Sequence, residues 1–171
     1  MSENQAKKVY LGIGSNLGNK ILNLEKAKFF LNNNLNIIII NVSRYYESES
    51  WPDKTKPFFL NIVLEIKTIL SPEELFYIIK KIEKKLGRKK GPKNSPRVCD
   101  IDILDYDQSN ITINLKNDKL IIPHPRLHKR NFVLMPLFEI CKNWKHPYLR
   151  INLKKLINSL NVDNLKSIKM L

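Results

Sequence analysis

Apolar and polar positions recur along this chain with periods that separate strands from helices. Residues 8–14, 37–46, 59–66 and 98–106 are rich in β-branched and aromatic side chains, which predicts four strands. Residues 19–33 and 71–86 carry apolar side chains at helical spacing, which predicts two helices. The resulting order, β-α-β-β-α-β, is typical of an α+β, ferredoxin-like core with an antiparallel sheet and helices packed on it.

Local signals support the helices. Ser71, Pro72 and Glu74 form a capping-box pattern at the start of the second helix, and Gly87 supplies its stop. The first helix is predicted more weakly, from three positions at roughly helical spacing: Leu22, Phe29 and Phe30.

The rest of the chain predicts additions to this core. An extra C-terminal hairpin is expected up to residue 122, then a loop rich in proline and histidine, and helical patterns near residues 130–142 and 152–160. A length of 171 residues suits one domain, and no internal repeat is present. We expect a single domain over residues 1–171, with a core at 7–160 and flexible tails at 1–6 and 161–171.

Composition bears on the cellular location of the protein. The longest aliphatic run, residues 37–40, is too short to cross a bilayer, and the first five residues lack the apolar stretch of a secretory signal. Cys99 and Cys141 are the only cysteines, so no disulfide framework is possible, and each is predicted to be a buried thiol. These features predict a cytoplasmic protein without membrane contact, for which a monomer would suffice.

Net charge is the unusual property. Thirty basic against 16 acidic residues give +14, with a pI near 9.8, which attracts nucleic acid, membrane surfaces or nucleoside triphosphates. The alternative is that much of this lysine is solvated surface. Seven basic residues gather between positions 84 and 97, where glycine and proline predict a loop: Lys84, Lys85, Arg88, Lys89, Lys90, Lys93 and Arg97.

A carboxylate pair follows this basic loop directly. Strand alternation places Cys99, Ile101 and Ile103 on the core face, and Asp100 and Asp102 on the other. Residues two apart on a strand lie about 6.6 Å from each other, which suits a pair of metal ions about 3.5–4 Å apart. Oxygen ligands suit Mg²⁺. Alone, Asp-x-Asp is more typical of a solvated polar face than of a metal site, but beside a cationic loop it resembles a triphosphate clamp with its metal site.

Two other segments were candidates for ligand binding. Residues 12–18 contain three glycines but lack both phosphate-loop spacings, so a strand-to-helix turn is predicted there. Residues 123–132 place His124, Arg126 and Arg130 where they could meet phosphates, and Phe132 offers a flat apolar face. His128 and Lys129 are expected at the surface.

Taken together, these segments resemble the 6-hydroxymethyl-7,8-dihydropterin pyrophosphokinase family of folate biosynthesis over about residues 10–160. That family passes the terminal pyrophosphoryl group of ATP to the pterin hydroxymethyl group and releases AMP. The motifs that carry the resemblance are Gly14-Ser15-Asn16-Leu17, Phe59-Leu60-Asn61, Ile82-Glu83 with Gly87-Arg88, Pro96-Arg97-x-x-Asp100-x-Asp102-Ile103-Leu104, Pro123-His124-Pro125, and Arg130-x-Phe132-Val133-Leu134-x-Pro136-Leu137.

The resemblance implies the site residues. Asp100 and Asp102 would bind two Mg²⁺ ions, and Arg88 and Arg97 would join them as catalytic residues. Residues implied to hold ATP are Glu83, Arg88, Arg97, Ile103, Leu120, Ile121, His124 and Arg130. Residues implied to hold the pterin are Ser48, Trp51, Phe59, Asn61, Asp100 and Phe132. Loops 47–57 and 88–96 would close over both substrates, and the pterin hydroxyl would attack the β-phosphorus directly.

The chain departs from the family pattern in two places. Asn94-Ser95 stands where an aromatic residue and a glycine usually precede Pro-Arg, so a second pterin-stacking partner is missing or replaced by another loop residue such as Trp51. Asp105 stands at a generally apolar position and is left without an account. The charge and element order also allow an RNA-binding RRM-like module, although residues 59–66 make a poor stacking platform. A second alternative is a family member that binds ATP without turnover.

Overall fold

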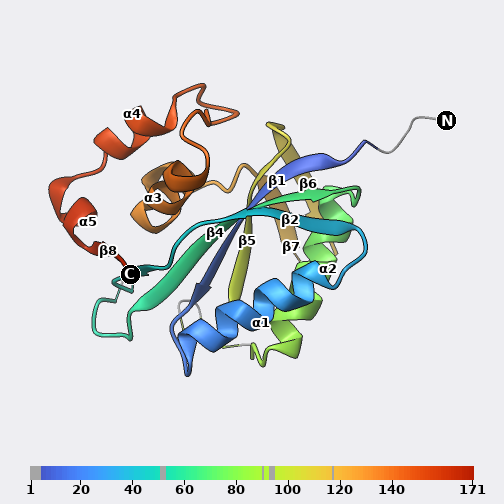
Figure 1. Ribbon diagram of the computed structural model, residues 1–171, viewed down its shortest axis with the longest axis horizontal. Helices are drawn as coiled ribbons and strands as arrows, with labels where there is room; N and C mark the ends of the chain where they lie inside the picture. Colours follow the sequence, from blue (N-terminus) through green and yellow to red (C-terminus); the bar gives the residue numbers. More distant parts are fainter. Residues whose placement is uncertain (1–4, 51–52, 90, 93–94, 117) are drawn as a thin grey trace.

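A computed structural model describes residues 5–50, 53–89, 91–92, 95–116 and 118–171 (Figure 1). One six-stranded antiparallel sheet runs in the order β5-β1-β4-β3-β8, and β2 also pairs with β4. A separate hairpin joins β6 to β7. The elements are β1 (Lys7–Ser15), α1 (Lys20–Asn32), β2 (Ile37–Val42), β3 (Tyr46–Ser48), β4 (Phe59–Thr68), α2 (Pro72–Lys85), β5 (Asp100–Tyr106), β6 (Ile111–Leu115), β7 (Asp118–Ile122), a 3-10 turn (Leu127–Lys129), α3 (Asn131–Ile140), α4 (Leu153–Asn158), α5 (Val162–Lys166) and β8 (Ile168–Met170).

The predicted β-α-β-β-α-β order is confirmed, with one strand broken in two. The sequence predicts a continuous strand over residues 37–46, whereas the structure has β2 and β3, which pair with opposite ends of β4. Ser43 lies in the break. Its hydroxyl accepts the backbone N–H of Val63 at 2.9 Å, and its own N–H donates to the carbonyl of Val63. A serine side chain thus replaces part of the strand ladder.

Helices α1 and α2 cover one face of the sheet (Figure 1), and their buried side chains form the main core with β1, β4 and β5. The capping box of α2 is confirmed, since Ser71 and Glu74 bond reciprocally. The predicted stripe on α1 is wrong: Leu22 and Phe29 are exposed, and Phe30 is only partly buried. The helix carries two apolar stripes, and the one with smaller members packs against the sheet: Leu24, Ala27 and Leu31.

The opposite face of the sheet carries a second core rather than solvent alone. Helices α3 and α4 lie on this side (Figure 1), where Val63 and Leu104 pack with Leu134 and Trp144. Cys99, Ile101 and Ile103 are buried on the α1–α2 side, as alternation predicts. Cys141 is only half-buried, contrary to expectation. Asp100 and Asp102 therefore occupy the part of the second face that its apolar cluster leaves free.

A β-bulge explains Asp105. Tyr10 pairs with Asp105 and Leu11 with Ile103, so Leu104 has no partner in the ladder and alternation is reset. Asp105 thereby turns toward the second core, where it is 1% exposed. It accepts hydrogen bonds from the indole N–H of Trp144 (2.7 Å) and from the backbone and side chain of Gln108. Burial raises the pKa of Asp105 despite these donors.

Replacing Asp105 should therefore lower stability without affecting the chemistry. In Asp105→Ala the buried Trp144 indole N–H loses its acceptor, so we expect the free energy of unfolding to fall by about 2 kcal/mol in urea titration. Asp107→Asn is the control, because Asp107 is exposed, its carboxylate pairs with Lys7 at the surface, and asparagine tolerates the left-handed backbone at this position (φ +50°). Equal losses in both variants would contradict a structural role for Asp105.

The last eleven residues differ from expectation. The sequence assigned 161–171 to a flexible tail, whereas the structure has α5 and β8 there, and β8 pairs with β3.

Among the described residues, no helix is both long and apolar enough to span a membrane.

Candidate active site

The candidate site lies where β1 ends and β5 begins. Gly14 of β1 pairs with Asn61 of β4 on one side and with Asp100 of β5 on the other. Gly12, two residues earlier, pairs with Asp102. Directly paired residues of antiparallel strands share a face. The sheet thus presents Asn61, Gly14 and Asp100 as one row across three strands.

Cationic side chains surround both aspartates. Arg88 and Arg97 each donate to one carboxylate oxygen of Asp100, at 2.6 and 2.8 Å. Arg130 donates to Asp102 at 3.0 Å, and His124 Nε2 lies 3.8 Å from the same oxygen. The structure therefore brings the basic loop, the carboxylate pair and the 123–132 segment together, although the sequence separates them by up to 42 positions.

Glu83 of α2 anchors this arrangement from below. Its side chain is buried and accepts hydrogen bonds from Arg88, from Lys80 (3.0 Å) and from the backbone N–H of Ile101 (2.7 Å). Arg88 thus bridges Glu83 and Asp100. The Glu83 carboxylate therefore holds the end of α2 and the start of the basic loop next to the first residues of β5.

The cations govern the ionisation of the site. Burial opposes ionisation of Asp100, but the charges of Arg88 and Arg97 outweigh it and hold its pKa below the ordinary value. Burial also lowers the pKa of His124, and the nearby Asp102 carboxylate opposes that effect only in part. At neutral pH the site therefore holds ionised Asp100 and a neutral imidazole.

The donor set fits Mg²⁺ shared with a polyphosphate. Two carboxylates face the same side of β5 and retain some solvent exposure. In the part of the chain that the structure describes, no group of three or more His, Cys, Asp or Glu side chains converges on one point. Two carboxylates with the remaining positions filled by phosphate oxygens and water is an arrangement that Mg²⁺ commonly adopts.

A second cluster lies across Gly14 from the aspartates. Asn61 donates to the hydroxyl of Ser48 (3.0 Å) and the carbonyl of Tyr46 (3.2 Å), so its Oδ1 is directed elsewhere. Phe59 pairs with Ser48 in register. Phe132 lies with its ring centroid 5.5 Å from the guanidinium carbon of Arg130. Trp51, also predicted in this pocket, and Asn94 lie outside the described residues.

Gly14 lies between these two clusters and has no side chain to fill the space there. A Cβ built on Gly14 would stand 3.1 Å from Asn61 Oδ1 and 3.4 Å from the ring of Phe59. Of the three glycines at 12–18, Gly18 lies in the predicted turn, at φ +68°, while Gly12 and Gly14 lie inside β1. The strand glycines leave room for a flat molecule between Asn61 and Asp100.

The three apolar residues implied to hold ATP differ in their exposure. Ile103 and Leu120 are buried in the main core, so their side chains face away from Asp100 and Asp102. Ile121 is exposed on β7. Only the backbone of these strands is available to a ligand at Ile103 and Leu120.

Asn16 is a site residue to which sequence reasoning gave no role. It is buried; its Oδ1 accepts the backbone N–H of Arg97 at 2.8 Å, and its N–H donates to the Arg97 carbonyl. Its Nδ2 donates to Ser50 Oγ and to the Pro57 carbonyl, both at 3.3 Å. Asn16 thus joins the two loops that flank the site. Its place in the Gly-Ser-Asn-Leu motif was the one available signal.

Comparisons with known proteins show which family the chain resembles. Residues 10–142 match the family described as 7,8-dihydro-6-hydroxymethylpterin-pyrophosphokinase (HPPK). A 2-amino-4-hydroxy-6-hydroxymethyldihydropteridine pyrophosphokinase of Aquifex aeolicus is 46% identical over 147 residues, 86% of this chain and 88% of that one. The Bacillus subtilis protein of the same name is 38% identical over 133 residues, 78% of this chain and 77% of that one.

Solved structures support the fold. A Plasmodium falciparum HPPK-DHPS crystal structure with pteroate matches 99% of this chain with a TM-score of 0.77, at 17% identity. A second HPPK-DHPS structure, in complex with substrates, matches 90% with a TM-score of 0.72, at 18% identity. The chain spans less than half of each of those longer chains, 47% and 43%. As the sequence motifs predict, the chain belongs to the HPPK family.

Proposed function

We propose that this chain transfers the terminal pyrophosphoryl group of ATP to the hydroxymethyl group of 6-hydroxymethyl-7,8-dihydropterin, using Asp100 and Asp102 to hold two Mg²⁺ ions. Family membership makes it a pyrophosphokinase of folate biosynthesis. The observation that carries the residue roles is the array of three arginines and one histidine around two adjacent carboxylates.

The polyphosphate would bind by exchange of partners. Without nucleotide, the arginines neutralise the two aspartates. With ATP bound, Arg88, Arg97 and Arg130 would turn to phosphate oxygens, which would leave both carboxylates able to hold the metal. Two bound Mg²⁺ ions supply charge neutralisation of the phosphates and orient the attacked phosphorus. Glu83 keeps Arg88 close to the site throughout this exchange.

The pterin would lie on the other side of Gly14. A flat ring with an amine edge suits Asn61, whose Oδ1 can accept from it while the amide nitrogen donates to Ser48 and Tyr46, and Phe132 offers an aromatic face. Ser48, Phe59 and Trp51 complete the proposed pocket. This places the substrate hydroxymethyl group toward Asp100 and the phosphates.

Transfer needs no covalent enzyme intermediate. The pterin hydroxyl oxygen forms a bond to the β-phosphorus, the bond from that phosphorus to the oxygen bridging to the α-phosphate breaks, and AMP departs. The hydroxyl proton passes to solvent. Positioning and charge neutralisation by Arg88, Arg97 and Arg130 lower the barrier.

An assay for AMP tests this proposal. Purified protein, Mg-ATP and the hydroxymethyl-dihydropterin should yield one AMP per pterin diphosphate, and chelation of Mg²⁺ should abolish it. ATP binding without AMP would indicate a family member that has lost turnover. Absence of AMP together with salt-sensitive RNA binding would instead support the RRM-like alternative.

The proposal also covers the oligomeric state, the cellular location and the partners of the chain. We propose that residues 7–170, from β1 to β8, form one folded unit that acts as a monomer, because this unit by itself brings the described site residues together. We further propose the cytoplasm as its location, because unpaired Cys99 and Cys141 suit a reducing compartment. Its partners are then small molecules, ATP and the pterin.

Asn16 should matter for both substrates. Asn16→Ala removes the hydrogen bonds that join the loop at Arg97 to the loop at Ser50 and Pro57, so we expect kcat/KM for ATP and for the pterin each to fall roughly tenfold. Asn23→Ala is a matched control, since the Asn23 side chain donates to Ser15 and Leu17 and, among the described residues, to neither of the two flanking loops. A loss confined to one substrate would contradict the joining role.

A further inference from the structure

The C-terminal strap, residues 161–171, reaches the pterin side of the site from outside the region that matches the family, which ends at residue 142. Its strand β8 pairs with β3 along its whole length, with Tyr46 opposite Met170 and Ser48 opposite Ile168. The N–H of Leu171 adds a bond to the carbonyl of Tyr45 at 2.9 Å. The strap thus holds the strand that carries Ser48.

Strand β3 depends on this support. It has only three residues, and without β8 it would be an edge strand held by β4 alone. Short edge segments open more readily than internal strands, because fewer hydrogen bonds and contacts hold them. Pairing on both sides fixes the backbone at Ser48 in the position that the proposed pterin pocket needs.

A second attachment fixes the start of α3. Asn131 lies between Arg130 and Phe132 and is mostly buried. Its side-chain amide donates to Ser167 Oγ at 3.1 Å and to the carbonyl of Asn164, while its Oδ1 accepts the N–H of Phe132 at 2.7 Å. One side chain therefore links the strap to the backbone of the proposed stacking residue.

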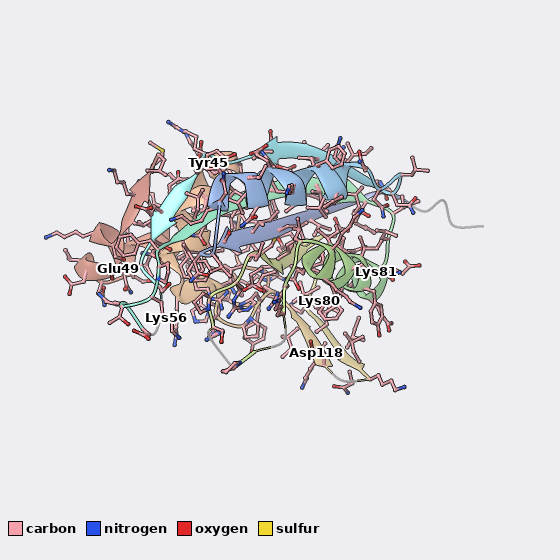
Figure 2. The ribbon with its side chains drawn as sticks, turned by 90° about the horizontal axis from the view of Figure 1, so that it is seen from below. Tyr45, Glu49, Lys56, Lys80, Lys81 and Asp118 are labelled. Carbon is pink, nitrogen blue, oxygen red and sulfur yellow. The ribbon has the colours of Figure 1, made fainter. Side chains whose placement is uncertain are left out.

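One side chain of the strap lies in the same row as two residues of the proposed pterin pocket. Ile168 is in register with Ser48, and Ser48 with Phe59, so the three share one row and one face. Ile168 is partly buried. Nearby, Glu49 forms an ion pair with Lys54, and Figure 2 shows Glu49 and Lys56 at the end of the molecule where α5 and β8 lie.

We infer that the C-terminal strap is a positioning element for the pterin substrate, and that Ile168 extends the apolar wall of the pterin pocket. The inference rests on the proposed function. The strap acts through β3 and through Asn131 on Ser48 and Phe132. Asp100 and Glu83 are held by α2, Arg88 and Arg97, so this part of the nucleotide side has support separate from the strap.

A double-mutant cycle tests the strap in the full chain. Asn131→Ala, Ser167→Ala and their double variant are titrated with the pterin in the presence of Mg²⁺ and a non-hydrolysable ATP analogue, and separately with that analogue alone. We expect each single change to raise the pterin Kd about threefold to tenfold, and the double variant to do no more than the larger single change. The Kd of the ATP analogue should stay within about twofold.

Two further variants examine Ile168. Ile168→Ala should raise the pterin Kd about threefold with kcat unchanged, whereas Lys169→Ala, on the opposite face of β8, should change neither. Three results would each overturn the inference. They are an equal loss of pterin and nucleotide affinity, additive effects of the Asn131 and Ser167 changes, and a pterin Kd that stays unchanged in the variants. If the wild-type chain forms no AMP, the proposed function fails; if it turns over while the variants bind pterin normally, only the strap inference fails.

Discussion

Asp100→Ala and Asp102→Ala should each lower kcat by at least about a thousandfold, because the removed carboxylate is one of only two proposed protein ligands for the metal ions. Each change also removes an acidic partner from neighbouring arginines. Asp100→Ala leaves Arg97 without its carboxylate and leaves Arg88 with Glu83 alone, and Asp102→Ala removes the carboxylate that Arg130 contacts. Binding of ATP without metal should therefore be retained or tightened. Rates of AMP formation and metal-free ATP titrations measure the two effects.

These variants should remain folded. Both side chains keep partial exposure and lie beside the second core rather than in it, so we expect the free energy of unfolding to change by about 1 kcal/mol or less. Asp107→Asn again serves as the control for loss of a surface carboxylate. Turnover within tenfold of wild type in either aspartate variant would show that this pair does not hold the metal.

Gly14→Val should block the pterin while sparing the nucleotide. The three nearest atoms to a Cβ at this position all belong to Asn61 and Phe59, the closest at 3.1 Å. A valine would occupy the space between Asn61 and Asp100 and press on the proposed pterin contacts. We expect a loss of about 3 kcal/mol in pterin binding, on the order of a hundredfold in Kd.

A substitution at a second glycine, Gly18, distinguishes a filled pterin site from a loss of folding stability. Gly18→Ala introduces a side chain at φ +68° with no atom within 4 Å, so it strains the backbone without filling the site. It should lower the free energy of unfolding by about 1 kcal/mol and leave the pterin Kd unchanged. Pterin titrations and urea unfolding of both variants give the comparison. Normal pterin binding by Gly14→Val would place the pterin elsewhere.

Much of the fold could be predicted because its elements are long enough to show a period. Alternation along residues 98–106 assigned Ile101 to the core and Asp100 to the site face, and the capping box located α2. Alternation failed at Asp105 because the bulge at Leu104 shifts the pattern by one residue. A bulge is set by packing against the neighbouring strand, which a single sequence does not display.

The strap and Asn16 could not be predicted for a related reason. Strands β3 and β8 have three residues each, too few to show a period, and a side chain, Asn131, ties the strap to α3. Asn16 acts on Arg97 and Pro57, which lie 81 and 41 positions away and approach it only in the folded chain. The aspartates, by contrast, are two positions apart, so their chemistry could be inferred from the sequence.

The central claim is direct transfer of an intact pyrophosphoryl group from ATP to the pterin alcohol. The most direct measurement uses hydroxymethyl-dihydropterin labelled with ¹⁸O in its hydroxyl group, with Mg-ATP, and mass spectrometry of both products. We predict unlabelled AMP and a pterin diphosphate that retains the label in its ester oxygen. Formation of ADP with a pterin monophosphate, or loss of the label from the pterin, would contradict the account.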